Sequence, residues 1–253
     1  LQIKWYGVII ATSMLIAVLI SMKCAKKRGL TSDDIISLAL LVIPFSIVFA
    51  RLYYVIFSGR TYTFWEIFKV WEGGMAIYGG LIGGAIAIAI FCKWKKKNFL
   101  DFADIIVPSL ILAQAIGRWG NFANQEAYGL LVTNQSMQWF PFAVFIEAEG
   151  AWHLATFFYE SLWNLIGFAV LLKVLWSNKS RGIVTASYFV FYGTGRFWIE
   201  GLRTDSLFWG NVRVSQLLSA FLVVAGVVWL TIIIMKNIKT KKQLKGEKQN
   251  AVL

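Results

Sequence analysis

The chain has 253 residues, of which 58% are hydrophobic, 16% are aromatic and only 15% are charged, and its formal net charge is +12. This composition lies outside the range of soluble globular domains and excludes that class. Several apolar stretches of roughly 18 residues or more are long enough to cross about 30 Å of hydrocarbon. The sequence therefore predicts an all-α integral membrane protein.

Seven apolar stretches are predicted to form a seven-transmembrane helix bundle, a single polytopic domain over residues 1–253. A signal peptide is the alternative for the first stretch, but its positive flank lies at the wrong end. Thr61 to Trp71 is aromatic and too short to cross, so a short interfacial helix is expected there. The predicted spans are about 5–22, 35–57, 75–92, 104–120, 157–176, 183–199 and 214–235, with a small extracytoplasmic loop subdomain at 121–156 and a cytoplasmic tail at 236–253.

The basic residues fall in blocks at every second connection between these stretches. The predicted cytoplasmic side carries 17 basic and 5 acidic residues, against 8 and 8 on the outer side. This asymmetry follows the positive-inside rule and predicts an N-terminus outside and a C-terminus inside. The positive charge thus reports topology, and no nucleic-acid partner is expected.

Arginine and lysine are also divided between the two sides. The cytoplasmic side has fifteen Lys and two Arg, whereas the outer side has two Lys and six Arg. Because a guanidinium can bind phosphate or carboxylate with two parallel hydrogen bonds, the outer side is predicted to hold anions. The six outer arginines are Arg51, Arg60, Arg118, Arg196, Arg203 and Arg213.

A glycine-rich segment, Glu72 to Gly84, begins the third span. Gly79 with Gly83, and Gly80 with Gly84, are spaced for close helix packing, and packing alone is one explanation of these glycines. Tyr78 places a hydroxyl among these small residues at the predicted outer end. A role in binding is the second explanation.

The densest polar segment, Ile116 to Gly129, follows the fourth apolar stretch. Within nine residues it contains Arg118, Asn121, Asn124, Gln125 and Glu126. Ionisable groups at a membrane helix end indicate a functional site, although a polar helix cap is the simpler alternative. If the helix continues through the segment, Arg118, Asn121 and Gln125 share one face.

Two later segments add charged groups at the same predicted level. Glu160 begins the fifth span, and the sixth delivers Arg196, Glu200 and Arg203, which with Tyr192 share one face if the helix persists. A local Arg196–Glu200 salt bridge is the alternative interpretation. The alternation of spans predicts one outer site that includes Arg51, Tyr78, Arg118, Glu160 and Arg196.

Such a site suits an anionic lipid headgroup. The sequence shows no Ser-His-Asp set, no metal-ligand cluster around the sole histidine, His153, and no nucleotide-binding loop, so no metal and no cofactor are expected. The kind of catalysis that these residues can still provide is electrostatic stabilisation of a departing phosphate. An anion or lipid transporter or channel lined by the same arginines is the main alternative, and a non-enzymatic scaffold is another.

Residues 117–129 read Gly117-Arg118-Trp119-Gly120-Asn121-Phe122-Ala123-Asn124-Gln125-Glu126-Ala127-Tyr128-Gly129. This motif resembles the signature of bacterial prolipoprotein diacylglyceryl transferases. Other segments resemble the family in order and spacing. They are Trp5-Tyr6-Gly7, Gly73 to Gly83, Phe158-Tyr159-Glu160, and Tyr192-Gly193-Thr194-Gly195-Arg196 through Glu200 and Arg203. Tyr78 replaces a His found in some members, and Ala155 replaces a usual proline.

The resemblance implies transfer of a diacylglyceryl group from phosphatidylglycerol to the lipobox cysteine of a preprolipoprotein, with release of glycerol phosphate, in a bacterial plasma membrane with the site facing the outer leaflet. It implies important roles for Arg118, Arg196 and Glu200. A mechanism that uses the His of some members as a base cannot be carried over to Tyr78, which we nevertheless predict as a catalytic residue. We hypothesise that Arg118 and Arg196 clamp the lipid phosphate, while Tyr78, Glu126 or Glu200 relays the proton. The predicted phosphatidylglycerol-binding residues are Arg118, Asn121, Asn124, Glu126, Gly129, Arg196, Arg203, Tyr78, Gly79 and Gly80.

Overall fold

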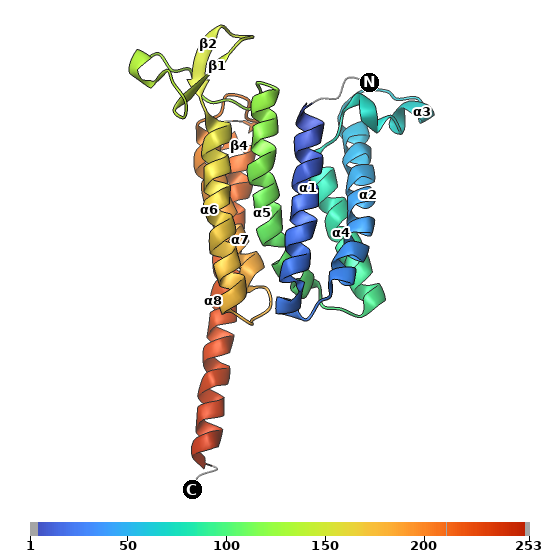
Figure 1. Cartoon of the computed structure of the whole chain (residues 1–253), viewed down its shortest axis with the longest axis vertical. Coiled ribbons are helices and arrows are strands. Elements are labelled where there is room, and N and C mark those ends of the chain that lie inside the picture. Colours follow the sequence, from blue (N-terminus) through green and yellow to red (C-terminus); the bar gives the residue numbers. More distant parts are fainter. Residues whose placement is uncertain (1–4, 211, 251–253) are drawn as a thin grey trace. The chain divides into compact units, whose positions relative to one another are not determined.

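A computed structural model describes residues 5–210 and 212–250 of the chain, and this part is mostly helical. The α-helices, shown in Figure 1, are α1 (Trp5–Cys24), α2 (Ser32–Phe57), α3 (Phe64–Ile67), α4 (Ile77–Lys95), α5 (Phe99–Ala123), α6 (Thr156–Ser177), α7 (Ile183–Gly201) and α8 (Val214–Asn250). Short 3-10 helices are η1 (Ala25–Arg28), η2 (Val70–Glu72) and η3 (Gln135–Met137).

Six helical segments in the described part are long and apolar enough to cross a membrane. They are Trp5–Arg28, Ser32–Phe57, Ile77–Lys95, Phe99–Ala123, Thr156–Ser177 and Val214–Gln243. These helices make the chain a multi-pass membrane protein of the predicted all-α kind. α7 is not among the six, because its 19 residues include Arg196, Glu200 and several glycines and hydroxyl-bearing side chains.

The chain folds into two compact units. Residues up to Ile20 and from Ala103 onward form one, which we call the large unit, and Ser21–Phe102 form the other, the small unit. The boundaries therefore fall inside α1 and α5. Every residue of the densest polar segment lies in the large unit, whereas Tyr78 and its neighbouring glycines lie in the small unit.

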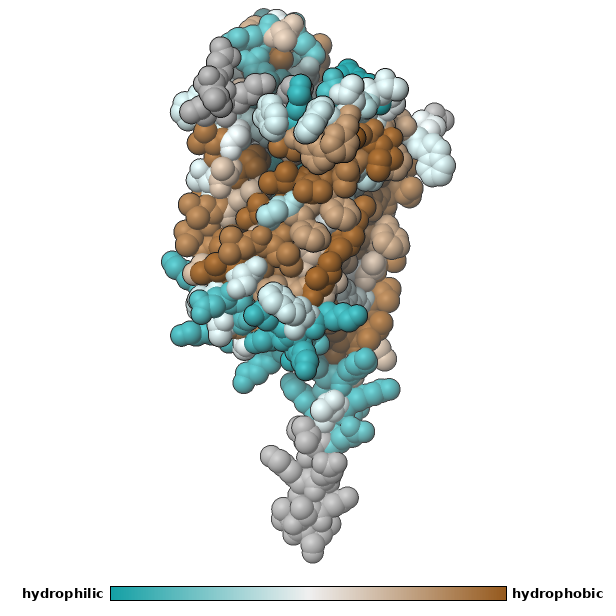
Figure 2. All heavy atoms as spheres, turned by 90° about the vertical axis from the view of Figure 1, so that its right-hand side faces the viewer, coloured by the Kyte–Doolittle hydropathy of each residue, from teal (hydrophilic) through white to brown (hydrophobic). Residues whose placement is uncertain are grey.

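In the small unit, α2 packs directly on α4. A Cβ on Gly79 would lie 2.4 Å from the Phe49 carbonyl oxygen, and one on Gly83 would lie 2.5 Å from Phe49 Cβ, so both glycines are needed for this close helix contact. Thr31 begins α2 with a capping box, accepting from Asp34 N and donating its own N–H to Asp34. Figure 2 shows a band of hydrophobic residues on the face that carries α2 and α4.

The expected interfacial helix over Thr61 to Trp71 is shorter than predicted. Only Phe64–Ile67 is α-helical, and η2 follows after a break. Where α3 ends, the Arg51 guanidinium donates to the carbonyl oxygens of Glu66 and Ile67, at 2.6 and 3.0 Å, and so satisfies acceptors at the helix end.

In the large unit, α7 packs against α6 and α8. Asp104 of α5 fixes the start of α7, because its carboxylate accepts the N–H groups of Gly182 and Thr185, each at 2.9 Å. α8 runs past the ends of α6 and α7 through the lysine-rich residues predicted as a tail (Figure 1).

Between α5 and α6 the chain forms a small antiparallel hairpin of β1 (Ala143–Ile146) and β2 (Ala151–Leu154). Val144 and Ile146 of β1 pack with Ala155 and Phe157 in a buried apolar cluster beside the start of α6. A second hairpin, β3 (Phe208–Trp209) and β4 (Val212–Arg213), precedes α8. The sequence analysis places a loop subdomain between α5 and α6 but predicts neither hairpin, because strands of four and two residues carry little periodic signal.

Candidate functional site

Four charged side chains from three helices meet at one end of the large unit. Glu160, at the start of α6, accepts a hydrogen bond from Arg118 Nη2 of α5 at 2.6 Å and another from Arg196 Nη1 of α7 at 3.0 Å. Arg196 Nη2 also lies 2.5 Å from Glu200 Oε2, an ion pair whose geometry is not that of a hydrogen bond. We call these four residues the arginine–glutamate cluster.

The cluster is balanced in charge but uneven in exposure. The Glu160 and Glu200 side chains are 3% and 2% exposed, whereas those of Arg118 and Arg196 are 20% and 15% exposed. Buried carboxylates are tolerated because each is paired with a guanidinium. A guanidinium has five N–H donors, so both arginines can still donate toward an anion on their exposed side.

The arginine–glutamate cluster continues into the densest polar segment through amide side chains. Arg118 Nη1 donates to Asn121 Oδ1 at 3.2 Å, and Asn121 Nδ2 donates to Glu126 Oε1 at 2.9 Å. Asn124 Nδ2 reaches the same Glu126 oxygen at 3.4 Å. The signature residues thus form one connected network with the arginines.

Gln125 does not share the face of Arg118 and Asn121. α5 ends at Ala123, and Gln125 has a positive φ of 50°, so its side chain points elsewhere and accepts the N–H of Glu147 at 2.9 Å. The condition for a shared face, a helix that continues through the segment, is not met here, because the chain turns toward the β1–β2 hairpin. The shared face predicted for Arg196, Glu200 and Arg203 is interrupted in the same way, because α7 ends at Gly201, before Arg203.

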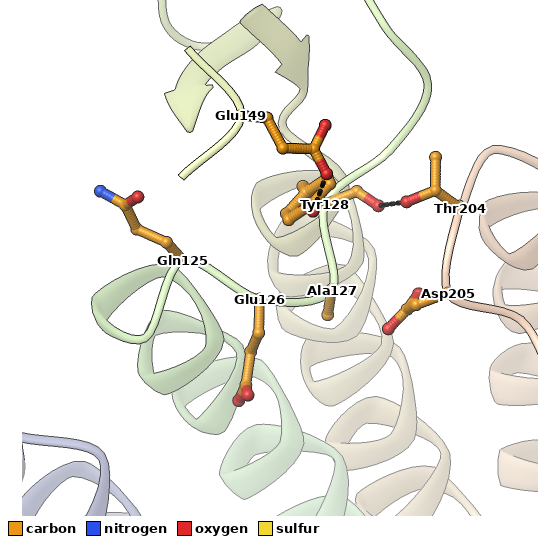
Figure 3. A pocket seen from close by; sticks show the side chains of 7 residues that line it. All are labelled: Gln125, Glu126, Ala127, Tyr128, Glu149, Thr204 and Asp205. Carbon is orange, nitrogen blue, oxygen red and sulfur yellow. Dashed lines mark hydrogen bonds between the residues drawn. The ribbon is translucent and has the colours of Figure 1, made fainter. Parts of the chain in front are cut away.

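A cavity of about 430 Å³ lies beside this network (Figure 3). The Tyr128 hydroxyl donates to Glu149, and Thr204 Oγ1 donates to the Tyr128 carbonyl at 3.3 Å, so the walls are tied together. Glu126 is shared between the cavity and the network that includes Arg118. The lining residues are Gln125, Glu126, Ala127, Tyr128, Glu149, Thr204 and Asp205.

Arg203 is held by Asp205. Its Nε and Nη2 donate to the two carboxylate oxygens at 2.9 and 2.7 Å, a bidentate pair. Partial burial acts to raise the pKa of Asp205, but the hydrogen bonds and charge of Arg203 outweigh it and hold that pKa below its usual value. Arg203 therefore joins the wall of the cavity through Asp205, and its charge also interacts with Glu200 and Glu160 of the arginine–glutamate cluster.

Gly129 has a packing role. A Cβ at this position would lie 2.7 Å from Thr156 Cγ2 and 2.9 Å from the Leu202 carbonyl oxygen. Its N–H donates to Leu154 O at 2.9 Å, and it forms an antiparallel bridge with Arg203. A side chain here would separate the signature segment from the residues that follow α7.

The remaining predicted residues belong to the small unit. Tyr78, Gly79 and Gly80 lie in the first turn of α4, where Tyr78 is 41% exposed and 6.4 Å from the Tyr53 ring. Arg51 is 6% exposed, and its guanidinium donates to four backbone carbonyl oxygens of its own unit. The arginine therefore holds a loop together.

Glu160 belongs to the predicted outer site, but the sequence gives it neither a catalytic nor a binding role. The Phe158-Tyr159-Glu160 motif at a helix start was the available signal. Its function as a bridge depends on three helices meeting, which no local pattern encodes. Among the described residues, no three His, Cys, Asp or Glu side chains gather as a metal site would require.

Comparison with known proteins identifies the family. Residues 1–232 match the family model described as prolipoprotein diacylglyceryl transferase. Proteins named phosphatidylglycerol–prolipoprotein diacylglyceryl transferase include one from Listeria monocytogenes, 46% identical over 94% of this chain and 87% of its own length. One from Streptococcus agalactiae is 47% identical, with 90% and 91% covered, and one from Clostridium perfringens is 44% identical, with 95% and 94% covered. The chain therefore belongs to the prolipoprotein diacylglyceryl transferase family.

Proposed function

We propose that this protein transfers the diacylglyceryl group of phosphatidylglycerol to the lipobox cysteine of a preprolipoprotein, forming a thioether and releasing glycerol phosphate. The observation that carries the proposal is the bridge of Glu160 between Arg118 and Arg196. It brings two partly exposed guanidinium groups from separate helices into one site. Two such groups provide the bidentate contacts that a phosphodiester requires.

The arginines act on the leaving group. As the bond between the glyceryl carbon and the phosphate oxygen breaks, negative charge builds on that oxygen, and Arg118 and Arg196 stabilise it. Glu160 and Glu200 hold both guanidinium groups in place before the lipid arrives, so little reorganisation is needed during the reaction. This is electrostatic catalysis by fixed charges.

The second substrate supplies the nucleophile. The cysteine sulfur attacks the glyceryl carbon as a thiolate, forming the carbon–sulfur bond while the carbon–oxygen bond breaks. The thiol proton passes to a nearby base, and the proposed candidates are Tyr78, Glu126 and Glu200. Glu126 is exposed and accepts from Asn121, so it is open to solvent and to substrate.

We assign the other predicted residues to lipid binding. Asn121, Asn124 and Glu126 extend the contacts from Arg118 toward the cavity, and Gly129 keeps the cavity wall close. Arg203 contributes through its pair with Asp205. Tyr78, Gly79 and Gly80 are proposed to contribute the small surface at the start of α4, which Tyr78→Phe and Gly80→Ala variants test directly.

We propose that the polypeptide is a single polytopic domain that crosses the membrane seven times, with α7 as the additional span. Its two charged residues are paired with partners on α6 or within α7, which lowers the cost of their burial. The distribution of Lys and Arg in the sequence supports an N-terminus outside and a C-terminus inside. The site then faces the outer leaflet of the bacterial plasma membrane, and the exposed aromatic residues around α3 lie at that surface.

A reconstituted assay tests the proposal. Purified protein in vesicles is incubated with phosphatidylglycerol labelled in its acyl chains and with a synthetic lipobox peptide. The expected product is a peptide carrying a thioether-linked diacylglyceryl group, with an equal amount of glycerol phosphate. A peptide whose cysteine is replaced by serine is the matched control. Movement of labelled lipid across the vesicle with no thioether would favour a transporter and contradict the proposal.

A further inference from the structure

A long part of the loop subdomain carries no charged side chain. Residues 127–146 contain no Asp, Glu, Lys or Arg, although they belong to the connection between α5 and α6, two helices long and apolar enough to cross a membrane. Charged residues make up about 25% of soluble domains, so a loop surrounded by water would be expected to carry several. We call residues 127–146 the uncharged segment.

The uncharged segment exposes large aromatic side chains. Trp139, Phe140 and Phe142 are 52%, 48% and 43% exposed. The Trp139 and Phe142 rings also contact each other edge to face, with their centroids 4.9 Å apart. Exposed apolar side chains that gather in this way mark a surface that contacts a partner or a membrane.

These aromatic side chains continue onto the two helices. The Phe140 ring lies 4.9 Å from Phe158 at the start of α6, and the Phe158 ring lies 6.4 Å from Trp119 of α5. Trp119 and Phe122 are 40% and 46% exposed and lie in the last two turns of α5. The exposed rings therefore begin where two spans end, beside the first hairpin (Figure 1). We call them the aromatic surface: Trp119, Phe122, Trp139, Phe140 and Phe142.

Polar groups beside the aromatic surface are paired within the loop. Trp139 Nε1 donates to Ser136 O at 2.9 Å, and Gln138 Nε2 donates to Val132 O at 2.9 Å. Asn134 Oδ1 accepts from the N–H and the hydroxyl of Ser136, at 3.1 and 2.8 Å. Because these groups have partners inside the protein, covering the surface with lipid leaves them hydrogen-bonded.

The charged side chains of the subdomain lie elsewhere. Between Ala127 and Ala155 the sequence has two acidic residues, Glu147 and Glu149, and both are exposed in the turn between β1 and β2. Glu149 lines the cavity shown in Figure 3, whereas the aromatic surface is not among the described residues around that cavity. The subdomain is therefore amphipathic, with an acidic turn beside the cavity and an uncharged aromatic surface outside it.

We propose that the aromatic surface lies in the interfacial layer of the bilayer, in contact with lipid headgroups and the adjoining part of the acyl chains. A bilayer is the occupant because the surface is continuous with the ends of α5 and α6, where lipid surrounds the spans, and because aromatic side chains favour this layer. The loop subdomain then rests on the membrane by this side and keeps its acidic turn in water. The proposal goes beyond the transferase reaction and does not depend on it.

Spin labels at single cysteines test the depth of the surface. Cys24 and Cys92 are first replaced by alanine, and the full chain is reconstituted in vesicles of phosphatidylethanolamine and phosphatidylglycerol. Labels are attached to Trp139→Cys and Phe142→Cys variants. Ala148→Cys is the matched control, because Ala148 is exposed in the hairpin turn of the same subdomain. Power saturation compares collisions with oxygen, which concentrates in the bilayer, and with a water-soluble nickel chelate.

The labels at positions 139 and 142 are expected to show an oxygen-to-nickel collision ratio several-fold higher than the label at position 148. Equal ratios at the three positions would overturn the proposal. Labels that are shielded from nickel only after a lipobox peptide is added would identify a peptide-binding surface and would also overturn it. If one of the two variants does not fold, the other decides.

The collision ratios are measured without peptide, so they are independent of the transfer assay. Absence of thioether product would contradict the proposed function and leave the position of the aromatic surface unaffected. Equal collision ratios in a protein that forms thioether would contradict only the membrane contact.

Discussion

Arginines near the ends of membrane helices are used in two different ways in this protein. In the arginine–glutamate cluster, Arg118 and Arg196 share the buried Glu160 and remain 20% and 15% exposed. In the small unit, Arg51 is 6% exposed, and backbone carbonyl oxygens occupy its guanidinium. Its ring neighbours Tyr54 and Tyr62 lie 5.9 and 5.7 Å away.

The difference shows what prepares an arginine for an anionic substrate. Carboxylate partners hold a guanidinium on one side and leave N–H donors on its other side. Backbone carbonyl partners distributed around the group instead accept hydrogen bonds from most of its N–H donors. Four of the five N–H groups of Arg51 donate to backbone carbonyl oxygens, so the arginine could bind an anion with two donors only by giving up contacts that hold the loop containing α3. The number of arginines on the predicted outer side therefore overstates the number whose N–H donors are open to a phosphate.

The sharpest test compares conservative replacements in the two regions. Arg118→Lys and Arg196→Lys are each expected to lower kcat/KM by about 100-fold to 1,000-fold, because a single ammonium cannot reproduce the planar pair of donors. Arg51→Lys is expected to stay within about threefold of the unmodified protein. Thioether formation at saturating and limiting phosphatidylglycerol measures all three. Equal losses at the three positions would contradict the distinction.

The bridge itself can be removed. Glu160→Gln leaves two guanidinium groups facing each other without the carboxylate between them, and breaking such a buried pair costs about 3 kcal/mol in the free energy of unfolding. Activity is expected to fall about tenfold, since the arginines lose their fixed spacing. Denaturant titration and the transfer assay together measure both effects. Leu162→Ala, on the exposed side of α6, is a suitable control. Unchanged activity in a fully stable Glu160→Gln variant would show that the bridge is not needed.

The same replacement in the small unit should act on stability. Arg51→Lys retains one of the donor groups and is expected to lower the free energy of unfolding by about 2 kcal/mol, because several buried carbonyl oxygens lose their partner. Proteolysis near Gly73 should become faster as the loop opens. A variant that is as stable as the unmodified protein but inactive would place Arg51 with the catalytic arginines.

The smallest effect is expected for the pair between Arg203 and the half-exposed Asp205. The folded-state pKa of Asp205 is lowered, so the pair contributes stability above the ordinary carboxyl pKa of about 4 and loses it as pH falls through the lower folded value. Asp205→Asn should therefore destabilise the protein by less than about 1 kcal/mol near neutral pH and by nothing at strongly acidic pH. Parallel unfolding curves at several pH values would show this. A difference that grows toward low pH would contradict the assignment.

Local patterns predicted much of the chain but misjudged some ends. The apolar stretch over residues 35–57 indicated the second span, and the structure contains it within α2. Arg118 and Asn121 share a helical face, because both lie before Ala123, where α5 ends. Gln125 lies beyond that end. Helical periodicity describes residues inside a helix and says little about where the chain leaves it. The break in the aromatic segment after α2 was missed for a related reason, since the carbonyl oxygens at the break accept from Arg51, which is 15 and 16 positions away in the sequence.

The sequence by itself determined that this is a multi-pass membrane protein of the transferase family, because apolar length and a long polar motif are properties of contiguous residues. Only the tertiary structure decided which arginines share a carboxylate and which hold a loop. Arg118, Glu160 and Arg196 are separated by 42 and 36 positions along the chain, and they meet because α5, α6 and α7 pack together. Partners at such separations are selected by helix packing, which no short segment of sequence specifies.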